Sequence, residues 1–371
     1  MRSEELVTQH PSRPCQVRSL HRVTYENGVA LQETLVAMRQ RESVPDQLLL
    51  LEHPPVITIG RGGDIRNLLV SAEQLKQRGI RFFETGRGGD ITFHGPGQLV
   101  GYPIIHLGEG NRDVRKYVTR LEEMLIRTVA ELGISATRID GKHGIWVGND
   151  KLAAIGVRIA RWVTSHGFAL NVDPDLDSFG LITPCGLNDS GVTSIARLTG
   201  SSPSMEEVRT ILIRHFSDLF ARDLQTKAET LRLVKVVVHD GDRVLLLHRK
   251  PQRGDFWQPV TGTIEEGESD HGAAKRELLE ETGSGLDPVP AGLTQSFMIE
   301  SSFLADRYEA PVVASEVLYS AQLSRNTPLR IDPEEHDDLG WFTFREAYEK
   351  IRWSDDRDAL ELIERKVATS P

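Results

Sequence analysis

Cysteine is scarce in this chain, and its scarcity argues against a disulfide-stapled fold. Only two cysteines occur among 371 residues, Cys15 and Cys185, and they stand far apart, so no disulfide framework is indicated. Long apolar runs are also missing, and the opening residues contain no apolar leader, so the sequence indicates neither export nor membrane insertion. We therefore expect a cytoplasmic protein with reduced thiols.

Basic residues are too few in the C-terminal part to balance its acidic residues. The chain has a net charge of −10, and residues 230–371 carry all of it, with 17 Lys and Arg against 27 Asp and Glu. An acidic region disfavours binding to nucleic acid and suits divalent cations. The length of the chain indicates two domains, each large enough to bury its own core.

The two domains are expected to meet near residue 224. Segment 204–224 predicts a helix, because Ser204 and Glu207 have the spacing of a capping box ahead of an apolar face. Strands at 231–238 and 243–250 flank a short turn and indicate a hairpin. The first half mixes strands with helices at 26–41 and 111–133, as α/β layering requires. We expect α/β (α+β) domains at 1–223 and 231–371, joined by a linker at 224–230.

Glycine-rich or polar stretches interrupt the first half at 87–103, 151–172 and 184–195. None matches a Walker sequence or G-x-G-x-x-G, and taken alone they are consistent with tight turns. Cys185 stands between Pro184 and Gly186, a setting typical of a sharp turn, where reactive groups are often mounted. The alternative is a small buried side chain with no chemistry. Cys15 has no comparable setting and is expected to be structural.

These stretches resemble the signature blocks of the lipoyl(octanoyl) transferase family. The first block is "RGGDITFHGPGQLVGYPI", the second is "KLAAIGVR" followed by "WVTSHGFALNV", and the third is "LITPCGLNDSGVTSI". The resemblance implies the fold of the biotin/lipoate protein ligase catalytic domain. It also implies transfer of an octanoyl group from acyl carrier protein to a lysine of a lipoyl domain, in 2-oxoacid dehydrogenase complexes or the glycine cleavage H protein. No cofactor, nucleic acid or membrane partner is implied. A ligase that activates free lipoate with ATP is the alternative, and the missing nucleotide loop argues against it.

The resemblance also assigns roles to single residues. Cys185 matches the family's nucleophile and Lys151 the lysine that pairs with it. A nearby ammonium favours the thiolate, and the amine can later accept a proton from the incoming lysine. The positions that match the acyl-binding residues are Arg87, Gly88, Gly89, Asp90, Ile91, Thr92, Phe93, His94, Ala154, Ile155, Gly156, Gly167, Phe168 and Ala169.

Side chains among these positions suggest how an acyl chain is held. Phe93, Ile155 and Phe168 are expected to wall an acyl channel, while small residues let backbone amides approach the thioester oxygen. His94 and His166 are open to a second interpretation as satisfied structural histidines. The basic residues Arg112, Arg115, Lys116 and Arg120 have helical spacing, and they form either a solvated face or a surface that attracts an acidic carrier protein.

Glutamates recur at helical spacing in "GTIEEGESDHGAAKRELLEETG". Glu277, Glu280 and Glu281 stand at i, i+3 and i+4, so their carboxylates are expected on one helical face. Such crowding is unfavourable unless a cation is bound, and carboxylate oxygens suit Mg²⁺ or Mn²⁺. Glu268 is expected to support the loop or a second ion, and Arg276 to orient a carboxylate.

This stretch resembles the Nudix box, which implies an αβα sandwich and metal-dependent hydrolysis of a phosphorylated small molecule. The matching positions are Gly262, Glu268, Arg276, Glu277, Glu280, Glu281 and Gly283. The flanking "DFWQPVTGTIEEGE" is similar to dihydroneopterin triphosphate pyrophosphohydrolase and points to a nucleoside or pterin di- or triphosphate. The alternative is a sensing or scaffolding module without turnover.

Overall fold

The structure is a computed structural model that describes residues 13–183, 191–227, 231–299 and 311–369. The chain forms two compact units. Among the described residues, unit 1 comprises 13–19 and 32–227, and unit 2 comprises 20–31 and 231–369. Within the described residues, no helix is both long and apolar enough to cross a membrane.

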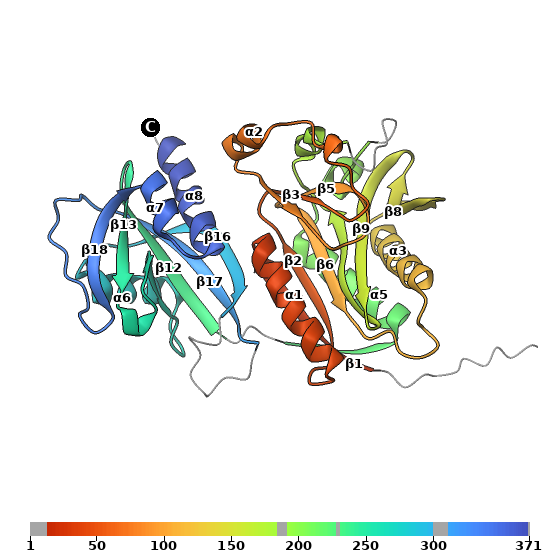
Figure 1. Ribbon diagram of the computed structural model, residues 1–371, viewed down its shortest axis with the longest axis horizontal. Coiled ribbons are helices and arrows are strands. Elements are labelled where there is room, and N and C mark those ends of the chain that lie inside the picture. Colours follow the sequence, from red (N-terminus) through yellow and green to blue (C-terminus); the bar gives the residue numbers. More distant parts are fainter. Residues whose placement is uncertain (1–12, 184–190, 228–230, 300–310, 370–371) are drawn as a thin grey trace, which may run out of the picture. The chain divides into compact units, whose positions relative to one another are not determined.

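Unit 1 is built on a mixed sheet with helices packed against it (Figure 1). Its elements, with β1 and α1 extending across the boundary between the units, are β1 (Arg13–Arg22), α1 (Tyr25–Gln40), β2 (Asp46–Glu52), β3 (Val56–Ile59), α2 (Ala72–Gln77), β4 (Arg81–Glu84), β5 (Ile91–His94), β6 (Gln98–Ile104), α3 (Val114–Glu131), β7 (Thr137–Ile139), β8 (Lys142–Val147), β9 (Asp150–Ala160), β10 (Val163–Asn171), α4 (Ile195–Thr199), α5 (Met205–Phe220) and β11 (Arg222–Thr226). Short 3₁₀ turns occupy Ile65–Asn67 and Leu176–Leu181.

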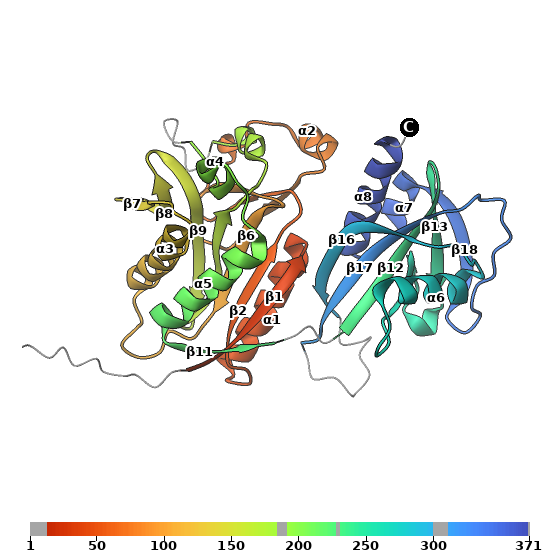
Figure 2. The ribbon, with the colours of Figure 1, turned by 180° about the vertical axis from the view of Figure 1, so that it is seen from behind.

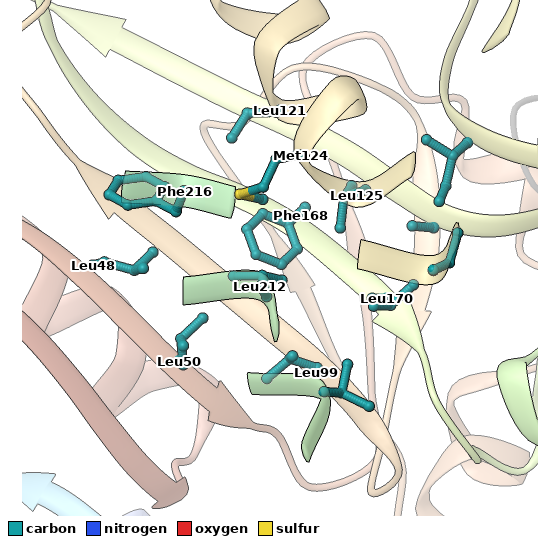
Figure 3. Close-up of a cluster of buried hydrophobic side chains, with 14 of the residues drawn as sticks. Leu48, Leu50, Leu99, Leu121, Met124, Leu125, Phe168, Leu170, Leu212 and Phe216 are labelled. Atoms are coloured by element: carbon teal, nitrogen blue, oxygen red, sulfur yellow. The ribbon is translucent and has the colours of Figure 1, made fainter. Parts of the chain in front are cut away.

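The large sheet of unit 1 has the strand order β1-β2-β6-β10-β9-β8-β7, and β11 pairs with β1 in parallel. One face packs against α3 and α5. Figure 3 shows the centre of this core, where Met124 and Leu125 of α3 meet Phe168 of β10 and Leu212 of α5. All four side chains are buried, and burial of this apolar area stabilises the layer at about 25 cal/mol per Å².

A second, three-stranded sheet has the order β4-β3-β5. It has its own small core, formed by Ile57, Ile59, Ile91 and Phe93 of its strands with Leu75 of α2. Leu181 and Ile182, the first two residues of the third signature block, pack into the same cluster. This sheet therefore positions the start of that block.

The predicted helix at 204–224 is confirmed at its start and is shorter at its end. The Ser204 hydroxyl accepts a hydrogen bond from the Glu207 N–H at 3.1 Å, as a capping box requires. The helix α5 ends at Phe220, because Ala221 adopts a left-handed conformation with φ of 49°. Residues 224–226 of the expected linker belong to β11. The domain boundaries themselves stay a prediction.

Unit 2 is a sandwich of helices around a sheet. Its elements, in addition to residues 20–31, are β12 (Leu231–Asp240), β13 (Arg243–Arg249), β14 (Phe256–Gln258), β15 (Val260–Thr263), α6 (Asp270–Thr282), β16 (Val289–Met298), β17 (Val313–Gln322), β18 (His336–Thr343), α7 (Phe344–Lys350) and α8 (Ser354–Thr369), with a 3₁₀ turn at Pro251–Arg253. The order β14-β13-β12-β17-β16 forms the sheet, while β15 pairs with β12 and β18 with β13. The predicted hairpin is present, with His239 opposite Val244.

Alternation along β12 separates the two cores of unit 2. Val234, Val236 and Val238 pack with α6, whereas Val237 packs with α7 and α8. Because successive side chains of a strand point to opposite faces, α6 covers one face of the sheet and the other two helices cover the other. Figures 1 and 2 show the two helical layers from opposite sides. The predicted αβα sandwich is confirmed.

Candidate functional sites

Lys151 lies at the second residue of β9, and its backbone holds the chain that follows residue 190. Its N–H donates to the carbonyl of Gly191 at 2.9 Å, and its carbonyl accepts from the Thr193 N–H at 3.0 Å. A Cβ at Gly191 would lie 2.1 Å from Oδ1 of Asp150, so any larger residue there would displace the Asp150 side chain. The Lys151 Nζ lies 4.8 Å from the centre of the Trp146 ring, a cation–π arrangement.

The chain ahead of residue 184 is held equally firmly. The Thr183 N–H donates to the Asn67 carbonyl at 2.8 Å, and the Leu69 N–H donates to the Leu181 carbonyl at 2.9 Å. Cys185 falls between these two anchored flanks and lies outside the described residues. Its pairing with Lys151 therefore stays a prediction.

A row of buried polar side chains connects the first signature block to the third. The His94 Nδ1 lies 3.0 Å from Gln98 Oε1, and Gln98 Nε2 donates to Asn171 Oδ1 at 3.0 Å. The Asn171 amide in turn donates to the Thr193 carbonyl at 2.9 Å. Sequence reasoning missed Gln98 and Asn171. The available signal was a polar amide at the end of an otherwise apolar strand, where a buried group needs a partner.

The two candidate histidines are buried and neutral. Burial, followed by repulsion from His53 and Arg87, lowers the pKa of His94 to about 3. Burial and the positive charges of Arg87 and Arg158 lower the pKa of His166 to about 4. His53, which the sequence did not single out, completes the group, with Nε2 2.6 Å from the Tyr102 hydroxyl. The neutral imidazoles of His94 and His166 can accept and donate a hydrogen bond, but these two groups hold no positive charge near pH 7.

The charged residues of the first block cross-link loops. The Arg87 guanidinium donates to the carbonyl and the hydroxyl of Thr58, both at 2.8 Å. The Asp90 carboxylate accepts from the Asp64 N–H at 3.1 Å and from the Asn67 amide at 2.7 Å. Both side chains therefore organise the loops around the site. The remaining residues of the block are Gly88 and Gly89 in the loop and Ile91, Thr92, Phe93 and His94 on β5, which pairs with β3.

The second and third sets of candidate residues face each other across one strand pair. Antiparallel pairing of β9 with β10 sets Ala154 opposite Ala169, Ile155 opposite Phe168, and Gly156 opposite Gly167. The Gly88 N–H donates to the Val157 carbonyl at 2.9 Å, which attaches the first block to the same strand pair. The structure thus brings the three sets of candidate residues together.

The three expected wall residues do not share one cluster. Phe168 is buried in the large core of unit 1, and Ile155 packs against that core. Phe93 instead belongs to the core of the small sheet, where its ring meets Phe179 edge-on at 5.5 Å. An acyl channel walled jointly by all three stays a prediction.

In unit 2, Arg276 is the centre of the Nudix-like stretch. Its guanidinium pairs with Glu268 at 3.0 Å, with Glu277 at 2.7 Å and with Glu280 at 3.0 Å. It also donates to the Thr263 carbonyl at 2.8 Å. The pairing expected for Arg276 is therefore present, and it involves three carboxylates rather than one.

The three helical glutamates differ in environment. Glu281 is buried, Glu277 is half-buried and Glu280 is exposed. Burial and the charge of Glu277 raise the pKa of Glu281 well above its usual range, and burial also raises the pKa of Glu277. The oxygens of a half-buried and a buried carboxylate are the kind of donor that a hard divalent cation prefers.

The glycines of the stretch have clear structural roles. A Cβ at Gly262 would lie 1.8 Å from the carboxyl carbon of Glu277, so glycine is needed for this approach. Gly283 caps α6 with φ of 71°. Among the described residues, no group of three or more His, Cys, Asp or Glu side chains is arranged to hold a metal ion. The metal-binding role expected for Glu268, Glu277, Glu280 and Glu281 therefore stays a prediction.

Known proteins resemble both units. Residues 24–217 match the family described as lipoyl protein ligase A/B catalytic domain, and residues 230–363 match the NUDIX domain. An octanoyltransferase of Myxococcus xanthus is 39% identical over 355 residues, which cover 93% of this chain and 98% of the relative. An octanoyltransferase of Solibacter usitatus is 52% identical over 208 residues, or 56% of this chain and 94% of the relative.

The second unit also has a solved structural neighbour. The E. coli dihydroneopterin triphosphate pyrophosphohydrolase is 28% identical and covers 36% of this chain and 95% of its own length, with a TM-score of 0.33. The Myxococcus match is long enough to span both units, so that relative shares the arrangement of two domains in one chain.

Proposed function

The chain belongs to the lipoyl protein ligase A/B catalytic-domain family and is an octanoyltransferase with a C-terminal NUDIX domain, and from this premise we propose how each unit works. In unit 1, Cys185 carries the octanoyl group as a thioester and Lys151 moves the protons. The donor is octanoyl-acyl carrier protein and the acceptor is a lysine of a lipoyl domain. The supporting observation is that Lys151 is hydrogen-bonded to the chain six residues after Cys185.

The chemistry balances with these two groups. The Cys185 thiolate attacks the donor thioester, a new C–S bond forms, and the carrier's thiol leaves with a proton from the Lys151 ammonium. The acceptor amine then attacks the acyl-enzyme, the C–N bond forms, and the Cys185 thiolate is released. Lys151, now neutral, takes the proton that the amine loses, which restores the starting state.

Mass spectrometry tests the covalent step. The full chain incubated with octanoyl-acyl carrier protein should gain one octanoyl group on Cys185, and Cys185→Ala should gain none. Lys151→Gln should slow transfer by about 10²–10⁴-fold, the usual contribution of a positioned proton-transfer group. Lys142→Gln is the matched control, because Lys142 Nζ also lies near the Trp146 ring, at 5.0 Å, yet stands outside the proposed site. An adduct that persists in Cys185→Ala would remove this cysteine from the mechanism.

For unit 2 we propose Mg²⁺- or Mn²⁺-dependent hydrolysis of a nucleoside or pterin di- or triphosphate. Glu277 and Glu281, with Glu280 and Glu268, would hold the ion. When bound, it would supply charge neutralisation at the diphosphate and activation of water. Arg276 orients the carboxylates, and the gathering of Glu268, Glu277 and Glu280 around its guanidinium is the observation that supports one shared site.

A panel of nucleoside and pterin triphosphates with Mg²⁺ tests this activity by release of phosphate or pyrophosphate. Glu281→Gln should abolish cleavage, whereas Glu266→Gln should not, because Glu266 is exposed and is not one of the matched positions of the box. One observation favours a binding module without turnover, namely that Arg276 already pairs with three of the four carboxylates. Absence of cleavage at every pH from 6 to 9 would decide for that alternative.

A further inference from the structure

Unit 2 contains a cavity of about 300 Å³ that the Nudix-like stretch does not explain. Its wall includes Lys235 of β12, Glu316 of β17, and Asp355 and Asp356 of the first turn of α8. A cavity of this size is at the small end of the range for small-molecule sites and suits one heterocycle.

The charged side chains of this wall are buried and unbalanced. The Lys235 Nζ lies 2.8 Å from Glu316, 3.5 Å from Asp355 and 2.5 Å from Asp356, and all four side chains are less than a tenth exposed. An ammonium has three N–H donors to share among these three carboxylates. One positive charge facing three acidic groups leaves the cluster short of hydrogen-bond donors, which is costly in a buried site.

The missing hydrogen-bond donor can be assigned to one carboxylate oxygen. Glu316 Oε2 accepts from both Lys235 and the Gln295 amide, the latter at 2.8 Å. Asp356 Oδ1 accepts from Lys235, but Asp356 Oδ2 has no hydrogen-bond partner among the described residues, although it is buried and its residue lines the cavity. Burial, only partly offset by Lys235, raises the pKa of Asp356 to about 7. Asp356 is therefore an unsatisfied acceptor in the wall of a small cavity.

The rest of the wall suits a flat ring. Phe256 and Trp353 line the cavity, and their rings meet edge-on with centroids 4.4 Å apart. Aromatic side chains bind planar heterocycles by stacking and edge contacts. Thr261 also lines the cavity, and its N–H donates to Glu281 Oε2 at 3.3 Å. The cavity is thus connected to the carboxylates proposed to act on the phosphates.

We propose that this cavity binds the 2-amino-4-oxopyrimidine edge shared by guanine and pterins, with the Asp356 carboxylate accepting from the ring N–H and the neighbouring amino group. This inference rests on the proposed hydrolase function of unit 2 and names its substrate class. Two adjacent donors match a carboxylate in a bidentate, charge-assisted pair. Adenine presents a ring acceptor beside its amino group, so one carboxylate oxygen would face a lone pair.

Binding and turnover by the full chain test the proposal separately. Calorimetry should detect binding of guanosine or neopterin and no binding of adenosine. The tighter of the first two ligands shows whether the cavity takes a guanine or a pterin. With Mg²⁺, kcat/KM for GTP or dihydroneopterin triphosphate should exceed that for ATP by at least about 100-fold. Base discrimination without cleavage would support the cavity and contradict the hydrolase. Cleavage without discrimination would support the hydrolase and overturn the cavity assignment.

A switch in the preferred ligand tests the role of Asp356 itself. Asp356→Asn replaces an acceptor by a donor, so binding should shift from guanosine toward xanthosine, which carries an oxygen where guanine carries the amino group. Asp242→Asn, in the exposed β12–β13 turn, is the matched control and should leave the preference unchanged. Thermal melting verifies that both variants fold. A folded Asp356→Asn variant that still prefers guanosine would overturn the assignment.

Discussion

At the scale of single residues, the two cysteines are expected to differ in reactivity. Cys15 is fully buried, and burial, with a smaller contribution from Asp46, raises the pKa of its thiol to about 12. Since the thiolate is the nucleophile, Cys15 should not react near neutral pH.

Alkylation of the native chain with iodoacetamide at pH 7.5 should therefore give one modification, at Cys185, identified by peptide mapping. Labelling in denaturant is the control and should modify both residues. Native-state modification of Cys15 would contradict the burial described for it.

Gly262 offers a residue-scale test of the C-terminal site. The methyl group of Gly262→Ala would meet the Glu277 carboxylate and displace it, so phosphate release should be lost, while stability should change little because the end of a glutamate side chain can move away. Gly285→Ala is the matched control, because a Cβ there meets no atom within 4 Å. Octanoyl transfer should survive both changes. Full phosphate release by Gly262→Ala would mean that the close approach to Glu277 is dispensable.

At the scale of elements, the sequence predicted a helix end or a turn correctly where neighbouring residues alone determine it. The cap of α5 at Ser204 and the hairpin of β12 and β13 follow from capping and turn chemistry. The pairing of β10 with β6, which sets Phe168 opposite Gly101, joins residues far apart in the sequence and did not follow from any such rule. The sequence analysis did not identify Lys235 for a related reason, because its partners lie on β17 and α8. Its inward position in an apolar strand was the only signal for its role.

Helix α3 corrects one expectation and sharpens another. Arg112 was expected on its basic face, but the helix begins at Val114 behind the cap Asp113, and the Arg112 guanidinium lies 5.5 Å from the Trp162 ring. Arg115 and Lys116 are exposed on the first turn. These two residues, with Arg120 partly exposed further along the same helix, remain the candidates for attraction of an acidic carrier protein.

Arg115→Glu should therefore raise KM for octanoyl-acyl carrier protein several-fold at low salt and leave kcat unchanged, because steering affects association. The difference should vanish at 0.5 M salt, where screening removes it. Arg127→Glu, on the same helix and paired with Glu123 at 2.8 Å, is the control for a general charge effect. An equal KM for wild type and Arg115→Glu at low salt would refute the surface.

At the scale of the whole molecule, buried histidines make stability depend on acid. The pKa values of His94, His166 and His336 in the folded state are about 3, 4 and 4, with burial the largest cause of each shift. Each lies below the unfolded value of roughly 6.5. Below pH 6.5 the unfolded chain therefore binds protons that the folded chain does not, so this stability is full above pH 6.5 and declines as the pH falls toward 4.

The urea midpoint should accordingly be lower at pH 4.5 than at pH 7. His94→Gln should reduce this dependence by removing one of the linked groups, whereas His143→Gln, on an exposed residue of β8, should not. In unit 2 the pKa values of Glu281 and Asp356 are raised, so these carboxyl groups favour the folded state as the pH falls. They offset part of the loss caused by the histidines, and the drop in stability between pH 7 and pH 4.5 should therefore be larger in unit 1. Equal midpoints at the two pH values for unit 1 would contradict the prediction.

The Trp146 indole, almost fully buried with the Lys151 ammonium near its ring, gives the enzyme a built-in optical label. Indole emission responds to nearby charge, so a catalytic cycle in which that lysine loses and regains a proton would be visible as a transient in stopped-flow fluorescence. The timing of acyl capture and release would then be readable without any attached dye.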